Sequence, residues 1–419
     1  MKENRKTTGN VPNLRFPEFE GEWERYKISD VLDFFPTNSL SWEQLEYETD
    51  NIYNLHYGLI HKGLPTQIEL SKCSLPNIKD EFIPNNYTLC NDEDIAFADA
   101  SEDTNDVGKV VEFLDCNNKK VVCGLHTIHG RDKLNLTIAG FKGYAFSSMA
   151  FRYQIRRLAQ GTKVYSISSR NFNECYIGIP SKEEQTKIST LLFLLDQRTA
   201  TQNKIIEELK KLKTALVDGL YNFPNGKHPL RFSEFSDCWQ QCIYGHLFQV
   251  STVRNTDYSV NRILSASQTR GMIERDEIDI DIKFEQESTR TYKIVQTGDY
   301  VIHLRSFQGG FAFSEKEGIC SPAYTVLRPS NALRYAFMKD FFMSDKFIKM
   351  LRLVTYGIRD GRSISVEEFF KLPIAIPSLE EQSKISKTIA ALEDKIYNES
   401  KVHSSLVIQK QNLLRQMFI

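Results

Sequence analysis

The sequence lacks a long apolar run, a secretory leader and an excess of charge of either sign. Its most apolar stretch is the five residues 191–195, whereas a helix that crosses a bilayer needs about 20. The first ten residues hold no hydrophobic segment, so no signal peptide is expected. Eight cysteines scattered over 419 residues indicate reduced thiols in a cytoplasm rather than a disulfide framework.

The charges nearly cancel, with 53 Lys and Arg against 54 Asp and Glu. A net charge of −1 argues against a protein that coats nucleic acid by bulk positive charge, and it leaves a local basic cleft open. A hydrophobic share of 41% is enough to bury a core, which excludes wholesale disorder. At about 150 residues per domain, the length predicts two to three domains.

Motifs of nucleotide-dependent and nucleophilic enzymes are also missing. The sequence has no Gly-x-x-x-x-Gly-Lys-Ser/Thr loop, no Gly-x-Gly-x-x-Gly after an expected strand, no Gly-x-Ser-x-Gly elbow and no Asn-Pro-Pro motif of amino-methyltransferases. The best metal candidate, Cys116, Cys123, His126 and His129, has a spacing unusual for zinc. We interpret these four as ordinary buried or loop residues, with a zinc site as the alternative. No catalytic, cofactor-binding or metal-binding residue is therefore expected in this chain.

What the sequence does contain is a tandem repeat. Residues 14–19, Leu-Arg-Phe-Pro-Glu-Phe, recur 216 positions later as Leu-Arg-Phe-Ser-Glu-Phe. Residues 179–189 recur 197 positions later, with nine of eleven positions identical. Because the offset shrinks across the unit, the copies agree at their ends and differ in their middles. A period of about 200 residues indicates a duplicated domain with a shared frame, not a short-repeat solenoid.

Each repeat is predicted to end in a long helix. Ser181 with Glu184, and Ser378 with Glu381, form capping-box patterns, in which the serine accepts from the third amide and the glutamate reaches back to the cap. No Gly or Pro follows before Gly219 in the first helix or before the chain end in the second. Each helix is therefore expected to run for about 40 residues, or about 60 Å.

Both helices carry one near-heptad apolar stripe, interrupted by Gln202 and by its repeat equivalent Glu399. A helix with a single stripe needs a partner. We predict that the two helices pair with each other, antiparallel; the alternative is that each packs on its own domain. The expected stripe residues are Ile188, Leu191, Leu195, Ile205, Leu209, Leu212 and Leu216 in the first helix, and Ile385, Ile389, Leu392, Ile396, Val402, Leu406, Leu413 and Met417 in the second.

The rest of each repeat alternates short β-rich runs with turn signals, which predicts an α+β fold of two mixed α/β domains in tandem. The clearest runs are 109–113, 300–303 and 324–327. One helix is expected over 335–353, where aromatic residues recur, and its counterpart in the first copy would hold Phe146 and Phe151. We interpret these aromatic residues as core rather than as a platform for base stacking.

Two similar domains, each followed by a rigid helix, suit a ligand with two parts at a fixed distance, and DNA half-sites are such a ligand. Loop residues agree with this hypothesis, because Arg and Gln bond base edges and basic turns contact phosphates. For any one of them, a solvated loop side chain is an equally good interpretation. They are Lys163 and Arg170 in the first copy and Arg305, Ser306, Gln308, Arg359 and Arg362 in the second.

The repeated motifs resemble the specificity subunits of type I restriction–modification systems, over nearly the whole chain. The resemblance rests on the Leu-Arg-Phe-x-Glu-Phe pair and on Ile-Pro-Ser-x-Glu-Glu-Gln at 179–185 and 376–382. It implies two target recognition domains, each reading half of a split DNA target, and two spacer helices that pair as an antiparallel coiled coil. By position, the recognition loops would also hold Tyr57, Ser101 and Arg270. The domains would span 12–180 and 229–377, and the spacer helices 181–221 and 378–419.

The resemblance also implies partners that hold the catalytic parts. Two methyltransferase subunits, with S-adenosylmethionine for adenine N6, and two ATP- and Mg-dependent restriction subunits would complete the complex. The first copy has Glu102–Asp103 where the second has Phe307–Gln308, so the halves should read different sequences. The acidic pair could accept from a cytosine amino group or merely face solvent. The rival hypotheses are a coiled-coil assembly scaffold without DNA binding and an enzyme with an unrecognised site.

Overall fold

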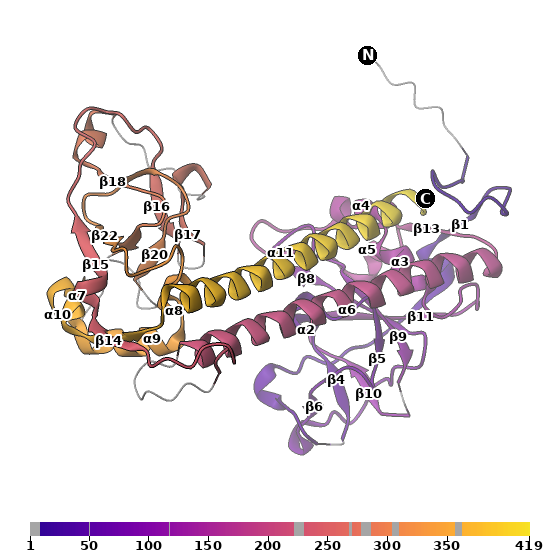
Figure 1. The fold of residues 1–419 in the computed structure, drawn as a ribbon. Coiled ribbons are helices and arrows are strands. Elements are labelled where there is room, and N and C mark those ends of the chain that lie inside the picture. Colours follow the sequence, from indigo (N-terminus) through magenta and orange to yellow (C-terminus); the bar gives the residue numbers. More distant parts are fainter. Residues whose placement is uncertain are drawn as a thin grey trace, which may run out of the picture. The chain divides into compact units, whose positions relative to one another are not determined.

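The computed structural model describes residues 9–49, 51–116, 118–221, 230–267, 270–277, 286–303, 310–356 and 363–419. The chain divides into two compact units, Met1–Asn203 with Lys401–Ile419, and Lys204–Ser400. Each unit holds one mixed α/β domain and a part of both long helices (Figure 1). Among the described helices, none is long and apolar enough to cross a membrane.

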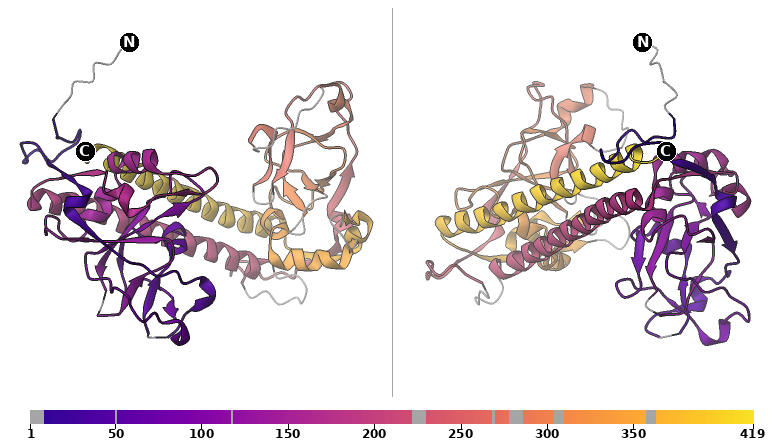
Figure 2. Two further views of the ribbon diagram at one scale, coloured as in Figure 1. Left: turned by 180° about the vertical axis from the view of Figure 1, so that it is seen from behind. Right: turned by 90° about the vertical axis from the view of Figure 1, so that its right-hand side faces the viewer.

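The two long helices pack against each other, as predicted. Helix α6 spans Lys182–Leu220 and α11 spans Leu379–Gln416, and they run side by side in every view (Figures 1 and 2). In the first unit, Lys410 of α11 binds Asp196 of α6 at 2.6 Å. In the second unit, Lys213 of α6 binds Glu393 of α11 at 2.5 Å. From the first of these ion pairs to the second, the residue number rises from 196 to 213 in α6 and falls from 410 to 393 in α11. The helices are therefore antiparallel.

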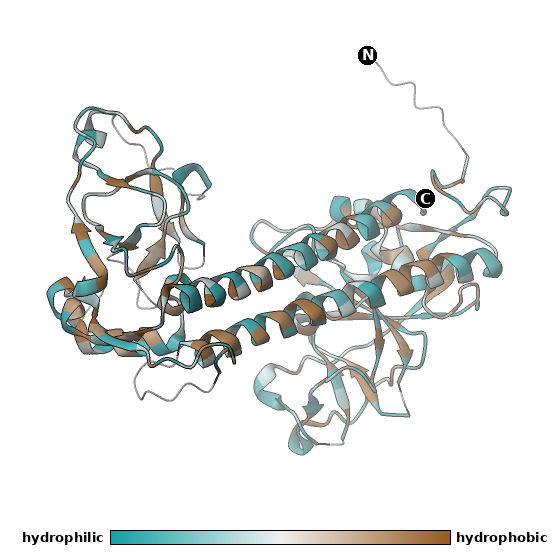
Figure 3. Cartoon of the chain, in the orientation of Figure 1, coloured by the Kyte–Doolittle hydropathy of each residue, from teal (hydrophilic) through white to brown (hydrophobic). Residues whose placement is uncertain are grey.

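Each helix presents one heptad seam of buried and half-buried residues, and the seam of α11 is that of α6 shifted by the repeat offset. The predicted stripe is wrong at Leu191, Ile205, Leu212 and Val402, which are exposed. At these places a residue one position along the helix continues the heptad spacing. Apolar and polar residues accordingly alternate along both helices (Figure 3). The seams consist of Ile188, Leu192, Leu195, Thr199, Gln202, Ile206, Leu209, Lys213, Leu216 and Leu220, and of Ile385, Ile389, Leu392, Ile396, Glu399, His403, Leu406, Lys410, Leu413 and Met417.

The start of each long helix is capped by serine as predicted, but its glutamate makes a different contact. The amide of Glu184 donates to Ser181 Oγ at 3.3 Å. The Glu184 carboxylate turns to Arg15 instead of the cap and accepts two bonds from its guanidinium, at 2.7 and 2.8 Å. An arginine fork offers two charge-assisted bonds, which outweigh a bond to one amide. The second copy repeats these contacts with Ser378, Glu381 and Arg231.

Each domain is built on the same four-stranded antiparallel sheet, in the order β2-β11-β7-β9 and β15-β22-β19-β20. The register also agrees: His129 pairs with Ala96 in the first sheet, and Val326 pairs with Val301 in the second. The three predicted strands are confirmed as β9, β19 and β22. The strands span Leu32–Phe35, Thr127–Asp132, Ile95–Ala98 and Val110–Asp115, and Phe248–Ser251, Thr325–Pro329, Tyr300–Ile302 and Phe311–Phe313.

A further strand pair joins the beginning of each domain to its end. Strand β1 (Glu24–Lys27) pairs with β13 (Tyr176–Ile179), and β14 (Gln240–Ile243) pairs with β25 (Pro373–Ile376) in the same register. The middles of the domains differ, as the shrinking offset predicted. The first domain adds β5 (Gln67–Glu69) to its main sheet and a second sheet of β10 (Val121–Cys123), β4 (Tyr53–Leu55), β6 (Asn77–Ile78) and β3 (Leu45–Glu46). The second domain has the pairs β16 (Leu264–Ser267) with β17 (Gly271–Glu274) and β18 (Lys293–Val295) with β21 (Gly318–Cys320).

The aromatic residues form core, as predicted, but they lie on two short helices in each domain rather than on one. The first domain has α3 (Phe141–Ser147) and α4 (Met149–Leu158), and the second has α8 (Lys339–Phe342) and α9 (Asp345–Leu351). The break falls at Ser148 and Ser344, whose hydroxyls accept from amides three residues later. Serine is favoured at such caps because it competes with the helix backbone for hydrogen bonds.

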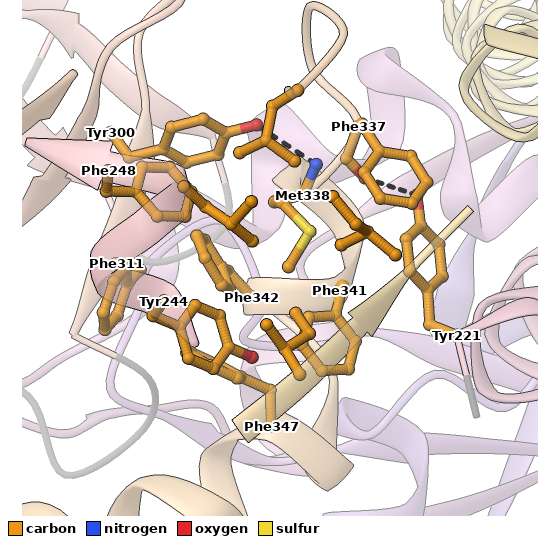
Figure 4. Packing of buried hydrophobic residues seen from close by; sticks show 14 of the residues in the cluster. Tyr221, Tyr244, Phe248, Tyr300, Phe311, Phe337, Met338, Phe341, Phe342 and Phe347 are labelled. Carbon is orange, nitrogen blue, oxygen red and sulfur yellow. Dashed lines mark hydrogen bonds between the residues drawn. The ribbon is translucent and has the colours of Figure 1, made fainter. Parts of the chain in front are cut away.

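Each domain core also receives the end of a long helix from the other repeat. In the second unit, Tyr221 follows α6 and donates to the carbonyl of Phe337 inside an aromatic cluster (Figure 4). In the first unit, Phe418 follows α11, and its ring lies 6.2 Å from that of Trp23 and 5.9 Å from that of Phe141. The helices are therefore anchored at both ends.

We expect Arg15→Ala to lower the free energy of unfolding by about 2–4 kcal/mol, because it leaves a buried carboxylate without its cation. The Glu184 side chain is 1% exposed, so water replaces the arginine poorly. Urea denaturation monitored by tryptophan fluorescence measures the change. Arg25→Ala is the control, since Arg25 is exposed and only overlies the Tyr176 ring. Equal losses in both variants would show that the ion pair does not hold this junction.

The buried Glu112 predicts a pH dependence of stability in the first unit. Its carboxylate accepts from the amides of Gly140 and Gly143 at 2.8 and 2.7 Å, and burial raises its pKa from 4.5 to about 7. Because the pKa is higher in the folded than in the unfolded chain, stability should fall as the pH rises from about 4.5 to about 7. Urea midpoints across this range should decline in the wild type and flatten in Glu112→Gln. Glu93→Gln is the control variant. If the urea midpoint of Glu112→Gln declined with pH as steeply as that of the wild type, the pH dependence would not come from Glu112.

Candidate nucleic-acid interface

In the first domain, the structure connects the segments that carry the predicted recognition residues. Tyr57 opens α2 (Tyr57–His61), and Nε2 of His61 lies 2.8 Å from the carbonyl oxygen of Ala100. Ser101 ends β8 (Ala100–Ser101) and pairs with Tyr165 of β12 (Tyr165–Ser166). Lys163, two residues before β12, is exposed, whereas Tyr57 and Ser101 are half-buried.

Arg170 belongs to the same neighbourhood through the backbone. It is exposed on the short helix α5 (Ser169–Phe172). Just before this helix, the amide of Ile167 donates to the carbonyl of Asp99 at 2.8 Å, next to β8. The structure therefore links all four predicted residues of the first copy to the segments around β8.

Aromatic and imidazole rings surround Tyr57, and sequence analysis missed most of them. Trp42 is 40% exposed, with its ring centroid 4.3 Å from that of His56. His56 in turn lies 4.8 Å from Tyr57, and His126 approaches the Tyr57 ring edge-on at 5.1 Å. Burial lowers the pKa of His56 to about 4, so this ring stays neutral. Lys62 lies 5.4 Å over the Trp42 ring, and a cation beside exposed rings is typical of nucleic-acid contacts.

The acidic pair in the first copy lies in a tightly bonded loop. The amide of Asp103 donates to Ser101 Oγ at 3.1 Å, and the amide of Asn105 donates to Asp103 Oδ1 at 2.8 Å. Arg156 of α4 donates to Asn105 Oδ1 at 3.1 Å. Ser101 and Asp103 therefore shape the loop, while Glu102 is exposed. This loop lies beside the segment of Lys163 because β8 pairs with β12. Sequence spacing alone could not predict this neighbourhood.

In the second copy, Arg270 is exposed and its guanidinium pairs with Glu277. A base or phosphate would have to replace this carboxylate. Arg305, Ser306, Gln308, Arg359 and Arg362 lie outside the described residues.

Residues on either side of the two undescribed segments, 304–309 and 357–362, are close together. The amide of His303 donates to the carbonyl of Gly310 at 2.8 Å. Strand β23 (Thr355–Tyr356) pairs with β24 (Ser363–Ile364), and a Cβ added to Gly310 would lie 2.8 Å from Cδ1 of Ile364. In the second domain, residues that flank two predicted recognition segments are therefore close to one another.

Of the four residues of the sequence's metal candidate, His126 lies apart from the other three in the structure. His126 is exposed and its Nδ1 lies 3.0 Å from Oδ1 of Asp99, and burial raises the pKa of that carboxyl. Cys123 and His129 are buried and lie beside Cys90, which the spacing did not suggest. Cys116 is buried near the same cysteine, with its sulfur 3.8 Å from the Cys90 carbonyl oxygen.

Two solved structures share the fold over nearly the whole chain. The crystal structure of a type I restriction-modification system S subunit from M. genitalium superposes with a TM-score of 0.57 at 16% identity, covering 98% of this chain and 99% of that one. A structure described as the basis of complex assembly and conformational transition of the type I R-M system gives 0.57 at 12% identity, covering 94% and 96%. No curated protein matches the sequence significantly.

The sequence itself matches a family model twice. The model of the type I restriction modification DNA specificity domain covers residues 20–211 and 251–406, which together make up well over half of the chain. Each match falls within one copy of the frame described above and covers most of it. The chain therefore belongs to the family of type I restriction–modification DNA specificity proteins.

Proposed function

We propose that this protein is the sequence-specific DNA-recognition subunit of a type I restriction–modification complex and reads a bipartite target. The observation that supports this most is the duplicated frame, which has the same strand order and register twice but different segments between the strands. A DNA target with two unlike halves needs two different recognition domains on one common frame. The two recognition domains would span residues 12–180 and 229–377.

The proposed contacts follow from residue chemistry. Lys163 and Arg170 are exposed cations that suit phosphates, whereas the rings and hydroxyl near β8 suit base edges or stacking. Trp42 joins the proposal because its exposed ring lies in the row with His56 and Tyr57. The proposed DNA-contacting residues are Tyr57, Ser101, Lys163 and Arg170 in the first domain and Arg270, Arg305, Ser306, Gln308, Arg359 and Arg362 in the second.

The proposal assigns the chemistry to partner subunits. This chain would be non-catalytic, and two methyltransferase and two restriction subunits would assemble on it in the cytoplasm. S-adenosylmethionine, ATP and Mg would be bound by those partners. Supporting this, one of the similar structures is described as belonging to the assembly of the type I R-M system. The antiparallel helices α6 and α11 would space the two domains and offer the docking surface.

Co-expression with the cognate methyltransferase subunit in a host without DNA methylation tests the proposal. We expect N6-methyladenine, located by sequencing, in one split motif with a fixed gap. No methylation by a complex shown to assemble would instead favour the rival hypothesis of a coiled-coil scaffold without DNA binding.

Arg270→Ala sharpens this experiment, because it alters one domain only. It should relax the motif in a single half-site, since one specific side-chain contact is worth about 1–3 kcal/mol of discrimination. Lys371→Ala is the matched control, because Lys371 is paired with Glu367 and Glu368 of its own helix. A change in both half-sites would contradict independent reading by two domains.

The spacer role makes a separate prediction. Four residues inserted after Gln202 of α6, with four inserted after His403 of α11, should lengthen the helix pair by about 6 Å. At about 3.4 Å per base pair, the gap in the methylated motif should grow by about two base pairs. Methylation maps of the variant and the wild type give the comparison. An active variant with an unchanged gap would refute the idea that the helices set the spacing.

A further inference from the structure

Three metal-binding side chains meet in the interior of the first domain. Cys90 precedes the turn to β7, Cys123 ends β10, and His129 lies in β11. Their ligand atoms all lie within 4.8 Å of one another and all three residues are buried, the one such group found among the described residues. The two sulfurs are 3.5 Å apart, whereas sulfurs bound to one tetrahedral zinc ion at about 2.3 Å lie about 3.8 Å apart. The cysteines are therefore already close to zinc-binding separation.

His129 is oriented as a metal ligand would be. Its Nε2 lies 2.7 Å from Oδ2 of Asp94, so this nitrogen carries the proton and donates to the carboxylate. Its Nδ1 is buried and has no hydrogen-bond partner in the described part of the chain. A buried polar atom without a partner costs free energy, and a bound metal would remove that cost. A histidine that binds zinc through one ring nitrogen usually donates its other ring N–H to a carboxylate or carbonyl, which fixes the ring orientation.

Asp94 is itself held in place. Arg131 donates two bonds to it, both of 2.7 Å. These bonds hold the Asp94 carboxylate in place beside Nε2 of His129, so that it fixes the orientation of the His129 ring.

The second domain shows that the frame does not require these ligands. There Asp299 and Arg328 repeat the ion pair of Asp94 and Arg131. Strand pairing is equivalent as well, since Ile294 faces Ile319 as Leu89 faces Val122. The positions that correspond to Cys90, Cys123 and His129 are Val295, Cys320 and Val326, all fully buried in an apolar cluster. At two of these positions the second domain thus has valine where the first domain has a thiol and an imidazole.

We propose that Cys90, Cys123 and His129 bind one Zn²⁺ ion. Thiolates and imidazole are the ligands of structural zinc sites. Binding converts the thiols of Cys90 and Cys123 to thiolates and releases both protons to solvent. Two thiolates balance the charge of the ion, which suits the apolar surroundings.

The ion would fix the loop that touches Tyr57. Cys123 and His129 flank residues 124–126, and the amide of Tyr57 donates to the carbonyl of Leu125 at 3.3 Å. His126 of this loop packs on the Tyr57 ring.

Metal analysis of the full-length chain tests this proposal. After growth with added Zn²⁺ and gel filtration, mass spectrometry of the elements should find about one zinc per chain. Exchange for Co²⁺ should produce a thiolate-to-cobalt charge-transfer band. A wild-type chain that carries no zinc and takes up neither Zn²⁺ nor Co²⁺ would overturn the proposal without any variant.

The second domain supplies the matched variant. Cys90→Val combined with His129→Val copies Val295 and Val326, so the domain should fold, as circular dichroism can verify, while zinc falls to background. Cys175→Val removes a buried thiol of another cluster and should keep the zinc. Full zinc content in the folded double variant would overturn the site. So would a disulfide between Cys90 and Cys123 in the chain as purified, found by peptide mapping without reductant.

Discussion

The structure depends on a buried carboxylate in the first turn of each long helix. Glu184 binds Arg15, and the next residue, Gln185, accepts from the amide of Ile138 and donates to the carbonyls of Leu136 and Pro180. The N-terminal motif, the segment after β11 and the helix start therefore meet at one point. Because every polar side-chain atom of Glu184 and Gln185 has a partner, the junction has one geometry. That geometry sets the direction in which the helix leaves its domain, and the second copy repeats it with Gln382.

Polar pairs in the helix seam are arranged with the same internal symmetry. Asp196 and Glu393 are repeat equivalents, and so are Lys410 and Lys213. Each acid comes from the first half of one helix and each lysine from the second half of the other. A slip of one heptad would separate both pairs at once. The pairs thus specify register more than they add stability, as polar residues do in coiled-coil seams.

The frame could be predicted from sequence because identical residues make identical contacts in both copies. Repeated motifs indicated the long helices, their pairing and two mixed α/β domains, and recurring aromatics indicated core. What failed was decided by tertiary partners: the Glu184 carboxylate prefers a distant arginine, and Ser148 ends a helix that aromatic spacing alone continued. The cluster at Cys90 was missed because Cys123 lies 33 residues away. Five of the ten predicted recognition residues are described. Strand pairing connects the segments of Ser101 and Lys163, and contacts of His61 and Ile167 join those of Tyr57 and Arg170, none of which spacing could show.

Within each repeat, the contacts of the frame and the predicted recognition residues lie in different segments. The junction, the seam and the four-stranded sheet use none of the predicted recognition residues. The segments between the strands can therefore vary in sequence while the contacts of the frame are retained. The interior of the frame tolerates change too, since one core holds Val295 and Val326 where the other holds Cys90 and His129. The repeated frame is thus compatible with two domains whose remaining segments differ.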